Sequence, residues 1–251
     1  MRRVLALTLT VLTAACASRE APPGTLEELT VKSEFTGETY ELQIFTPDAL
    51  EEEAGATVVY IFDGPENQSR VLEQFRLALD EGAEPAILAL IPGSNRVEDF
   101  TPTPNERGTN GGGQAAFIDF VLEEFTPLVE EDGAGGDPSR RITFGHSLGG
   151  LLSGTLWYDE PFATRAGIAS PSFWWDGGLF FGKLDQPPIN QGPIVVACGE
   201  EENLGMFVYT DDFSRQMRSD YDIDVTYEAF KNKNHQSALE SALGLTFREL
   251  L

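Results

Sequence analysis

The chain has 251 residues, and the 41% that are hydrophobic are enough for one sizeable core in a single domain. Its 41 acidic and 17 basic residues give a formal net charge of −24, which repels phosphate backbones and argues against a nucleic-acid partner. With two histidines and two cysteines, the chain has too few ligands for a cysteine–histidine metal cluster, so we expect no metal and no cofactor.

The N-terminus has the pattern of an export signal. Two arginines precede an uncharged, mostly apolar stretch that is too short to span a bilayer, so residues 1–15 are predicted to be a signal peptide. The stretch ends in "LTAAC", which resembles a bacterial lipobox in which Cys16 is lipidated, although Leu12 lies one place further from the cysteine than usual. We expect a lipoprotein of the cell envelope (periplasm or outer membrane) with no other membrane contact; an ordinary secreted protein is the alternative.

A polar stretch follows the signal. Residues 16–28 contain Pro22-Pro23-Gly24 and are predicted to be a flexible tether, with one folded domain over residues 29–251. The other cysteine, Cys198, lies in the apolar run "PIVVACG" and is interpreted as a small buried hydrophobic residue.

Strands and helices alternate along the rest of the chain. Residues 40–44 alternate between apolar and polar, which indicates a half-buried strand, whereas 57–63 and 85–91 are continuously apolar, as in central parallel strands. Helices are predicted around residues 71–79 and over 114–131, 148–158, 206–219 and 236–250, and further strands over 141–145, 166–170, 193–199 and 224–230. This order predicts an α/β fold with a doubly wound, mostly parallel sheet and helices on both faces.

The stretch "ITFGHSLGG" places Ser147 between Gly145 and Gly149, at a strand end and before a helix. This G-x-S-x-G context is typical of a nucleophile elbow, in which a strained turn projects the serine Oγ and a Cβ at either glycine would clash. The Leu148 N–H at the helix N-terminus would face developing negative charge. The alternative is a glycine-rich turn without chemistry.

A serine nucleophile needs a base, and the chain has two histidines. His146 is adjacent to Ser147 and cannot reach its Oγ, so we expect it to pack or hydrogen-bond beside the turn. His235, between the last strand and the last helix, is therefore the candidate base by elimination. The acid should follow the penultimate strand, where the residues alone leave Glu200, Glu201 and Glu202 open.

Over residues 29–250 the chain resembles the esterase D-like family of α/β-hydrolases, and within it the bacterial ferric-siderophore esterases that cleave trilactones. Besides the elbow, the resemblance rests on "VVYIFDGPEN", "RVEDFTPTP", "SPSFWW" and "NHQSALESAL". It implies an α/β-hydrolase fold, Ser147 as nucleophile, His235 as base, and Glu202 as acid from its offset to Gly199. Relatives also include feruloyl and acetylxylan esterases, mycolyltransferases and S-formylglutathione hydrolases. The signal sequence argues against the last of these, because S-formylglutathione hydrolysis takes place in the cytosol.

The resemblance also implies an oxyanion hole. Its first donor would be the Leu148 N–H, and its second should come from the loop at Gly64. The next residue, Pro65, has no N–H, so the second donor would be Gly64 itself or a neighbour.

Three further residues are candidates for substrate binding. Trp174 and Trp175 would contact an aromatic or acyl group or else pack in the core, and Arg96 would bind an anionic group or pair with Asp99. We predict an exported serine esterase that hydrolyses a small-molecule ester through an acyl-enzyme. The alternatives are an acyltransferase of the mycolyltransferase kind and a non-catalytic binding lipoprotein.

Overall fold

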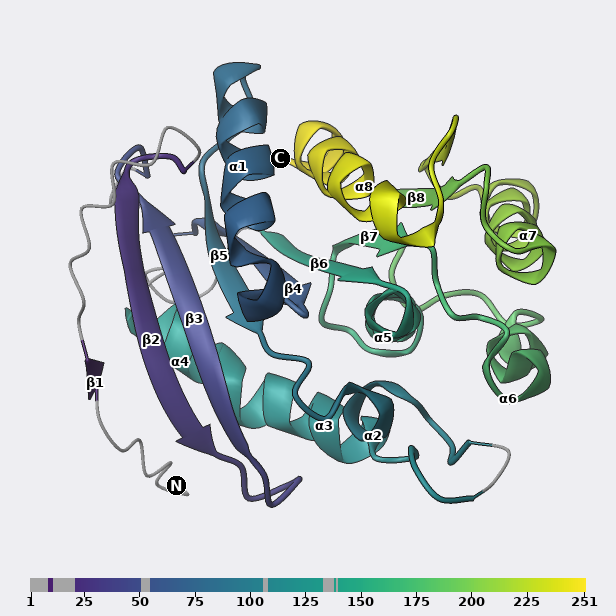
Figure 1. Cartoon of the computed structure of the whole chain (residues 1–251), viewed down its shortest axis with the longest axis horizontal. Coiled ribbons are helices and arrows are strands. Elements are labelled where there is room, and N and C mark those ends of the chain that lie inside the picture. Colours follow the sequence, from purple (N-terminus) through teal and green to yellow (C-terminus); the bar gives the residue numbers. More distant parts are fainter. Residues whose placement is uncertain (1–8, 11–20, 51–54, 106–107, 133–137, 139) are drawn as a thin grey trace.

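One twisted sheet forms the centre of the fold. The computed structural model describes residues 9–10, 21–50, 55–105, 108–132, 138 and 140–251. Within these residues the sheet has nine strands in the order β1-β2-β3-β5-β4-β6-β7-β8-β9 (Figure 1). The strands are β1 (Leu9–Thr10), β2 (Gly24–Lys32), β3 (Thr39–Pro47), β4 (Thr57–Phe62), β5 (Ala86–Ile91), β6 (Arg140–His146), β7 (Arg165–Ala169), β8 (Ile194–Gly199) and β9 (Val225–Phe230).

The predicted parallel centre of the sheet is confirmed. Strands β5, β4, β6, β7, β8 and β9 pair in parallel, and every residue of β4, β5 and β8 is buried, as their continuous apolar runs indicate. The strands β1, β2 and β3 extend the sheet with antiparallel pairs at one edge. Because the six central strands are parallel, their carboxyl ends all lie at the same end of the sheet, where α/β folds place their ligand sites.

Helices cover both faces of the sheet, as predicted. They are α1 (Gln68–Asp80), α2 (Arg96–Phe100), α3 (Gln114–Phe120), α4 (Thr126–Asp132), α5 (Leu148–Asp159), α6 (Trp175–Gly178), α7 (Leu204–Tyr221) and α8 (His235–Leu250). α1 and α8 pack together on one face, and α3, α4, α5 and α7 bury their apolar sides on the other (Figure 1). The predicted helix over 114–131 is one continuous helical segment with a π-helical turn at Val121–Phe125 between α3 and α4.

The N-terminal boundary of the domain differs from the prediction. β2 begins at Gly24 and pairs with β3 along its whole length, so residues 24–28 belong to the sheet rather than to a tether. The apolar residues of β2 alternate too weakly for a period-two pattern to reveal it. Cys16 and, apart from the two residues of β1, the predicted signal peptide lie outside the described residues. Among the helices that the structure describes, none is long and apolar enough to cross a membrane.

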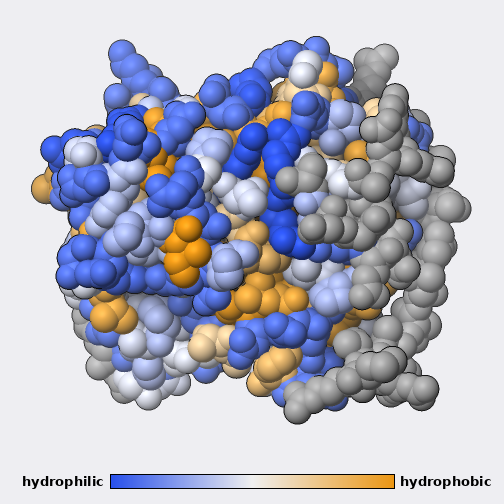
Figure 2. All heavy atoms as spheres, turned by 180° about the vertical axis from the view of Figure 1, so that it is seen from behind, coloured by the Kyte–Doolittle hydropathy of each residue, from blue (hydrophilic) through white to orange (hydrophobic). Residues whose placement is uncertain are grey.

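The surface agrees with the acidic composition. Seen from behind, most of the described surface is hydrophilic, with apolar groups in smaller areas, some gathered around the centre of that face (Figure 2). The exposed apolar side chains include Trp174 and Leu179, which lie in the segment that follows β7.

Candidate active site

The turn between β6 and α5 holds Ser147 in a strained conformation. Its φ of 62° and ψ of −118° lie in a region that side-chain-bearing residues rarely adopt. Hydrogen bonds of 3.0 Å fix its backbone: its N–H donates to Ala169, and its carbonyl accepts from the N–H groups of Leu151 and Ser172. The structure therefore forms the predicted elbow, with the Leu148 N–H at the start of α5.

The two glycines of the elbow are not equally constrained. A Cβ on Gly145 would lie 2.0 Å from the Gly149 carbonyl oxygen, so no side chain fits there without moving backbone. A Cβ on Gly149 would lie 3.3 Å from the Phe62 Cβ and 3.4 Å from the Asp63 Oδ2, so these neighbours would have to shift by a few tenths of an ångström. The expected clash is therefore severe at Gly145 and mild at Gly149.

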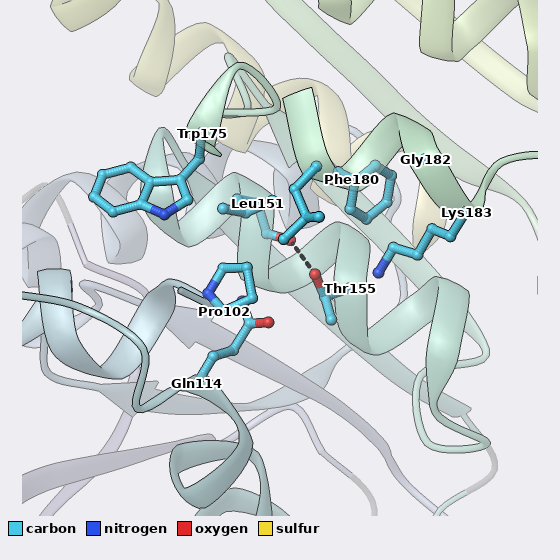
Figure 3. A pocket seen from close by; sticks show the side chains of 9 residues that line it. Pro102, Gln114, Leu151, Thr155, Trp175, Phe180, Gly182 and Lys183 are labelled. Carbon is cyan, nitrogen blue, oxygen red and sulfur yellow. Dashed lines mark hydrogen bonds between the residues drawn. The ribbon is translucent and has the colours of Figure 1, made fainter. Parts of the chain in front are cut away.

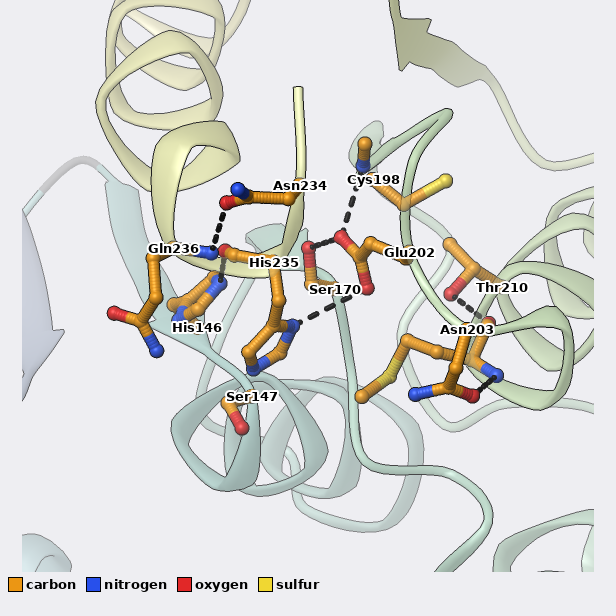
Figure 4. A network of polar contacts seen from close by, with 12 residues as sticks. His146, Ser147, Ser170, Cys198, Glu202, Asn203, Thr210, Asn234, His235 and Gln236 are labelled. Carbon is orange, nitrogen blue, oxygen red and sulfur yellow. Dashed lines mark hydrogen bonds and ion pairs between the residues drawn. The ribbon is translucent and has the colours of Figure 1, made fainter. Parts of the chain in front are cut away.

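The candidate base begins helix α8. The Asn234 side chain accepts hydrogen bonds from the N–H groups of Gln236 and Ser237, and the Ser237 hydroxyl accepts from the Asn234 N–H. This capping box fixes where α8 starts, and His235 is its first residue. The imidazole lies between Glu202 and Ser147, with its Nδ1 toward the carboxylate and its other nitrogen toward the serine (Figure 4).

Of the three glutamates after β8, the structure brings Glu202 to the histidine. Its Oε2 lies 3.2 Å from His235 Nδ1, and its side chain is only 1% exposed. Its Oε1 accepts from the Gly199 N–H at 2.9 Å and from the Ser170 hydroxyl. Burial acts to raise the pKa of Glu202, but the hydrogen bonds from His235, Gly199 and Ser170 outweigh it and hold the pKa below its usual value.

The other two glutamates point elsewhere. Glu200 and Glu201 are exposed, and their backbone N–H groups pair with the carbonyls of Phe230 and Lys233. The loop therefore presents one carboxylate inward and two to solvent.

His146 supports the candidate base rather than the nucleophile, within the packing or hydrogen-bonding role expected from sequence. Its Nε2 lies 2.8 Å from the His235 carbonyl oxygen, and because a carbonyl only accepts, this nitrogen carries the proton. The two imidazole rings lie 4.5 Å apart. Burial, reinforced by the nearby His235, lowers the pKa of His146 to about 4, so this ring is neutral at neutral pH.

Sequence reasoning missed two serines that support the site. Ser170 and Ser172 follow β7, the strand between β6 and β8 in the sheet. The buried Ser170 hydroxyl donates to Glu202, and the buried Ser172 places its Oγ 3.4 Å from the Ser147 Oγ. Both lie in "SPSFWW", but that stretch contains no pattern that singles them out, because their partners are distant in the chain.

The Gly64 N–H, one of the expected second oxyanion donors, is already engaged. The Gly64 N–H donates to the Ile91 carbonyl at 3.1 Å, so the end of β5 already uses it. Pro65, which begins a short 3₁₀ turn over Pro65–Asn67, has no N–H. The Leu148 N–H and a neighbour of Gly64 are thus the predicted donors that stay open.

Arg96 lies beside the elbow, but with another partner than expected. Its guanidinium binds both carboxylate oxygens of Asp63, at 3.1 and 2.9 Å, and its Nη2 lies 3.4 Å from the His146 carbonyl oxygen. The predicted pair with Asp99 is wrong, because the Arg96 guanidinium binds Asp63 and Asp99 is buried with Tyr40 as its hydrogen-bond partner. The Arg96 side chain remains 36% exposed, so a substrate group can still reach it.

The two tryptophans differ in burial: Trp174 lies at the surface, whereas Trp175 is half-buried and packs against the core. Trp174 is 44% exposed, and both indoles line a hollow of about 450 Å³ together with Pro104, Asn105 and Thr109. The Trp175 indole N–H donates to the Thr103 carbonyl at 3.1 Å, which fixes its ring.

Cys198 is buried, as predicted, and burial raises the pKa of its thiol to about 11.

Each candidate catalytic group thus follows a different parallel strand: Ser147 follows β6, Glu202 follows β8 and His235 follows β9. Because these strands lie in the order β6-β7-β8-β9, their ends bring the three side chains together. In the part of the chain that the structure describes, no group of three His, Cys, Asp or Glu residues is arranged to hold a metal ion.

Comparisons with known proteins identify the family of the chain. The model of the family described as "Putative esterase" matches residues 33–237. The chain belongs to this family. It is accordingly a carboxylic ester hydrolase of the serine hydrolase type.

Its relatives include siderophore esterases. The chain is 29% identical over 214 residues to ferri-bacillibactin esterase BesA of Bacillus subtilis. The aligned residues cover 72% of this chain and 71% of that protein. The BES protein from Bacillus cereus has a similar fold, with a TM-score of 0.78 and 22% identity over 97% of this chain and all of that one. The siderophore hydrolase EstB from Aspergillus nidulans follows with a TM-score of 0.75 and 19% identity over 88% of this chain and 93% of that one.

Proposed function

We propose that Ser147, His235 and Glu202 are the catalytic triad of an esterase that works through an acyl-enzyme. The observation that carries the proposal is the arrangement of the three side chains. The imidazole of His235 lies between the buried carboxylate of Glu202 and Ser147, which has a strained backbone conformation. The buried carboxylate keeps the proton on Nδ1 and leaves Nε2 free to act as the base.

In the first half-reaction the Ser147 Oγ attacks the ester carbonyl carbon while its proton moves to His235 Nε2. The carbonyl electron pair moves to oxygen, where the Leu148 N–H and the N-terminus of α5 stabilise it. The intermediate then expels the alcohol, which takes the proton from His235, and leaves the acyl group on Ser147. Water repeats the sequence with His235 as base, which releases the acid and restores the serine.

We propose siderophore esters, or esters with aromatic or acyl groups, as the substrate class. The curated relative acts on ferri-bacillibactin by its name, and the hollow lined by the exposed Trp174 and the half-buried Trp175 offers aromatic surface to a planar group. Arg96, held by Asp63 and partly open to solvent, is the candidate contact for an anionic part of the substrate.

Labelling with a fluorophosphonate probe, compared between the wild type and Ser147→Ala, tests whether Ser147 is the nucleophile. We expect labelling of the wild type alone, and a loss of p-nitrophenyl acetate hydrolysis of about 10⁴-fold in the variant. Labelling of both proteins, or more than a tenth of the activity in the variant, would refute the mechanism. A panel of feruloyl esters and ferric catecholate trilactones, with and without an acceptor alcohol, identifies the substrate and separates hydrolysis from acyl transfer.

We further propose export through residues 1–15, with a lipid on Cys16 that anchors the domain in the cell envelope. The support is the sequence alone: a basic start, an apolar stretch and "LTAAC". In a Gram-negative host the protein should fractionate with membranes, and Cys16→Ser should release or misprocess it. Mass spectrometry of an unmodified N-terminus beyond Cys16 would contradict lipidation.

A further inference from the structure

Another cavity, of about 330 Å³, lies beside the helix that carries the elbow. Leu151 and Thr155, both on α5, form one wall of it (Figure 3). At a rise of about 1.5 Å per residue, they lie about 6 and 12 Å along the helix axis from Ser147. The cavity therefore begins within one or two helical turns of the proposed nucleophile.

Trp175 connects this cavity to the tryptophan hollow. It lines both of them, while Trp174 lines only the hollow. Because the Thr103 carbonyl holds its indole N–H, the ring is fixed before any ligand arrives. A substrate that lies against Trp175 in the hollow can thus extend into the cavity, or the reverse, without any movement of this ring.

Apart from Gln114, whose amide N–H donates to the Phe100 carbonyl at 2.8 Å, the remaining walls favour a neutral apolar group. Phe180 is 5% exposed and stacks on Phe173 at 4.3 Å between ring centroids, so its position is set by the core. The Lys183 ammonium lies 4.4 Å from the centre of the Phe180 ring and pairs with Asp159, which compensates its charge. The Thr155 hydroxyl already donates to the Leu151 carbonyl.

We propose that this cavity binds a neutral apolar part of the substrate, aromatic or branched aliphatic, several bonds from the ester that Ser147 attacks. Thr155 and Trp175 would then determine specificity, because they bound the space that such a group fills. The proposal rests on the proposed function for the position of the ester and adds the chemical class of a group that the catalytic residues do not contact.

Two variants of one residue test it. Thr155→Phe fills the cavity from α5, and Thr155→Val removes the hydroxyl but keeps the volume. We measure kcat/KM for p-nitrophenyl 4-phenylbutyrate and for 4-phenylbutyl acetate, each as a ratio to p-nitrophenyl acetate. The first ester places the ring on the acyl side, and the second places it on the alcohol side.

We expect Thr155→Phe to lower at least one ratio about tenfold or more, a typical effect of lost fit in an apolar pocket, while Thr155→Val keeps both ratios near those of the wild type. A loss of folded enzyme would lower all rates together and leave the ratios unchanged. Unchanged ratios in a folded Thr155→Phe would overturn the proposal. If that variant does not fold, the same ratios are measured for Gly182→Leu, which adds a side chain at another residue that lines the cavity and is tolerated because a Cβ there meets no atom within 4 Å.

A binding measurement separates the cavity from the chemistry. In a Ser147→Ala background, 4-phenylbutyrate titrated into the protein and followed by NMR should bind about tenfold more weakly when Thr155→Phe is added. Equal binding would overturn the cavity proposal. Hydrolysis that survives Ser147→Ala would instead refute the proposed function and leave this comparison intact.

Discussion

The most informative single change is Glu202→Gln, because it keeps the size of a buried side chain and alters one atom at the histidine. The Gly199 N–H and the Ser170 hydroxyl both donate to Oε1, so the amide oxygen of the glutamine stays there. Its NH₂ group then faces His235 Nδ1 at the position of the present 3.2 Å contact. Since an NH₂ group only donates, Nδ1 must accept, and the proton moves to Nε2, the nitrogen that faces Ser147.

The magnitude follows from that tautomer. With the proton on Nε2, His235 cannot accept the serine proton, and the matching change in a serine-protease triad lowers kcat about 10⁴-fold. This corresponds to about 5.5 kcal/mol of transition-state stabilisation. Glu200→Gln and Glu201→Gln are matched controls on exposed neighbours, and we expect them to change kcat by about twofold or less.

The assay compares kcat of the three variants on p-nitrophenyl acetate at neutral pH, where the lowered pKa of Glu202 keeps the wild-type carboxylate ionised. Nitrogen-15 NMR of the imidazole reports the tautomer directly. A loss below tenfold in Glu202→Gln, or equal losses in all three variants, would refute the reasoning. An unchanged tautomer would refute it even if activity fell.

Three further predictions concern the elbow and its support. The pKa of His146 is about 4 in the folded protein against an ordinary 6.5, so its contribution to the free energy of unfolding is complete above about pH 6.5 and falls by about 3 kcal/mol as the pH drops toward 4. His146→Phe should therefore flatten this part of the pH profile in urea denaturation, and parallel profiles would contradict the assignment. Ser147→Gly should be inactive yet about 1 kcal/mol more stable than Ser147→Ala, because glycine tolerates a φ of 62°; equal urea midpoints would argue against strain at this turn. Gly145→Ala should lower the free energy of unfolding by about 2 kcal/mol or more, and Gly149→Ala by about 1 kcal/mol or less. The reason is that the new Cβ atoms would meet their neighbours at 2.0 and 3.3 Å, respectively. Thermal unfolding that ranks the two variants in reverse would contradict this difference.

The sequence by itself determined the fold class and pointed to Ser147 and His235, two of the three residues proposed as the triad, while the third, Glu202, was favoured by the resemblance to esterases alone. Continuous apolar runs such as those of β4 and β8 are buried on both faces wherever they pair, so their pattern does not depend on the details of their neighbours. Ser147 is marked by a local pattern of glycines, and His235 was identified because the chain has only two histidines. Both inferences depend on short-range geometry and on composition.

Tertiary structure alone decided which partners these residues have. Three adjacent glutamates look alike in sequence, and Glu202 differs only because Gly199 and Ser170 hold its carboxylate inward. Arg96 pairs with Asp63, 33 residues away, rather than with a neighbour on its own helix. The direction of a side chain after a strand end depends on the loop that follows and on the groups across the sheet edge, and those contacts exist only once the parallel strands have assembled.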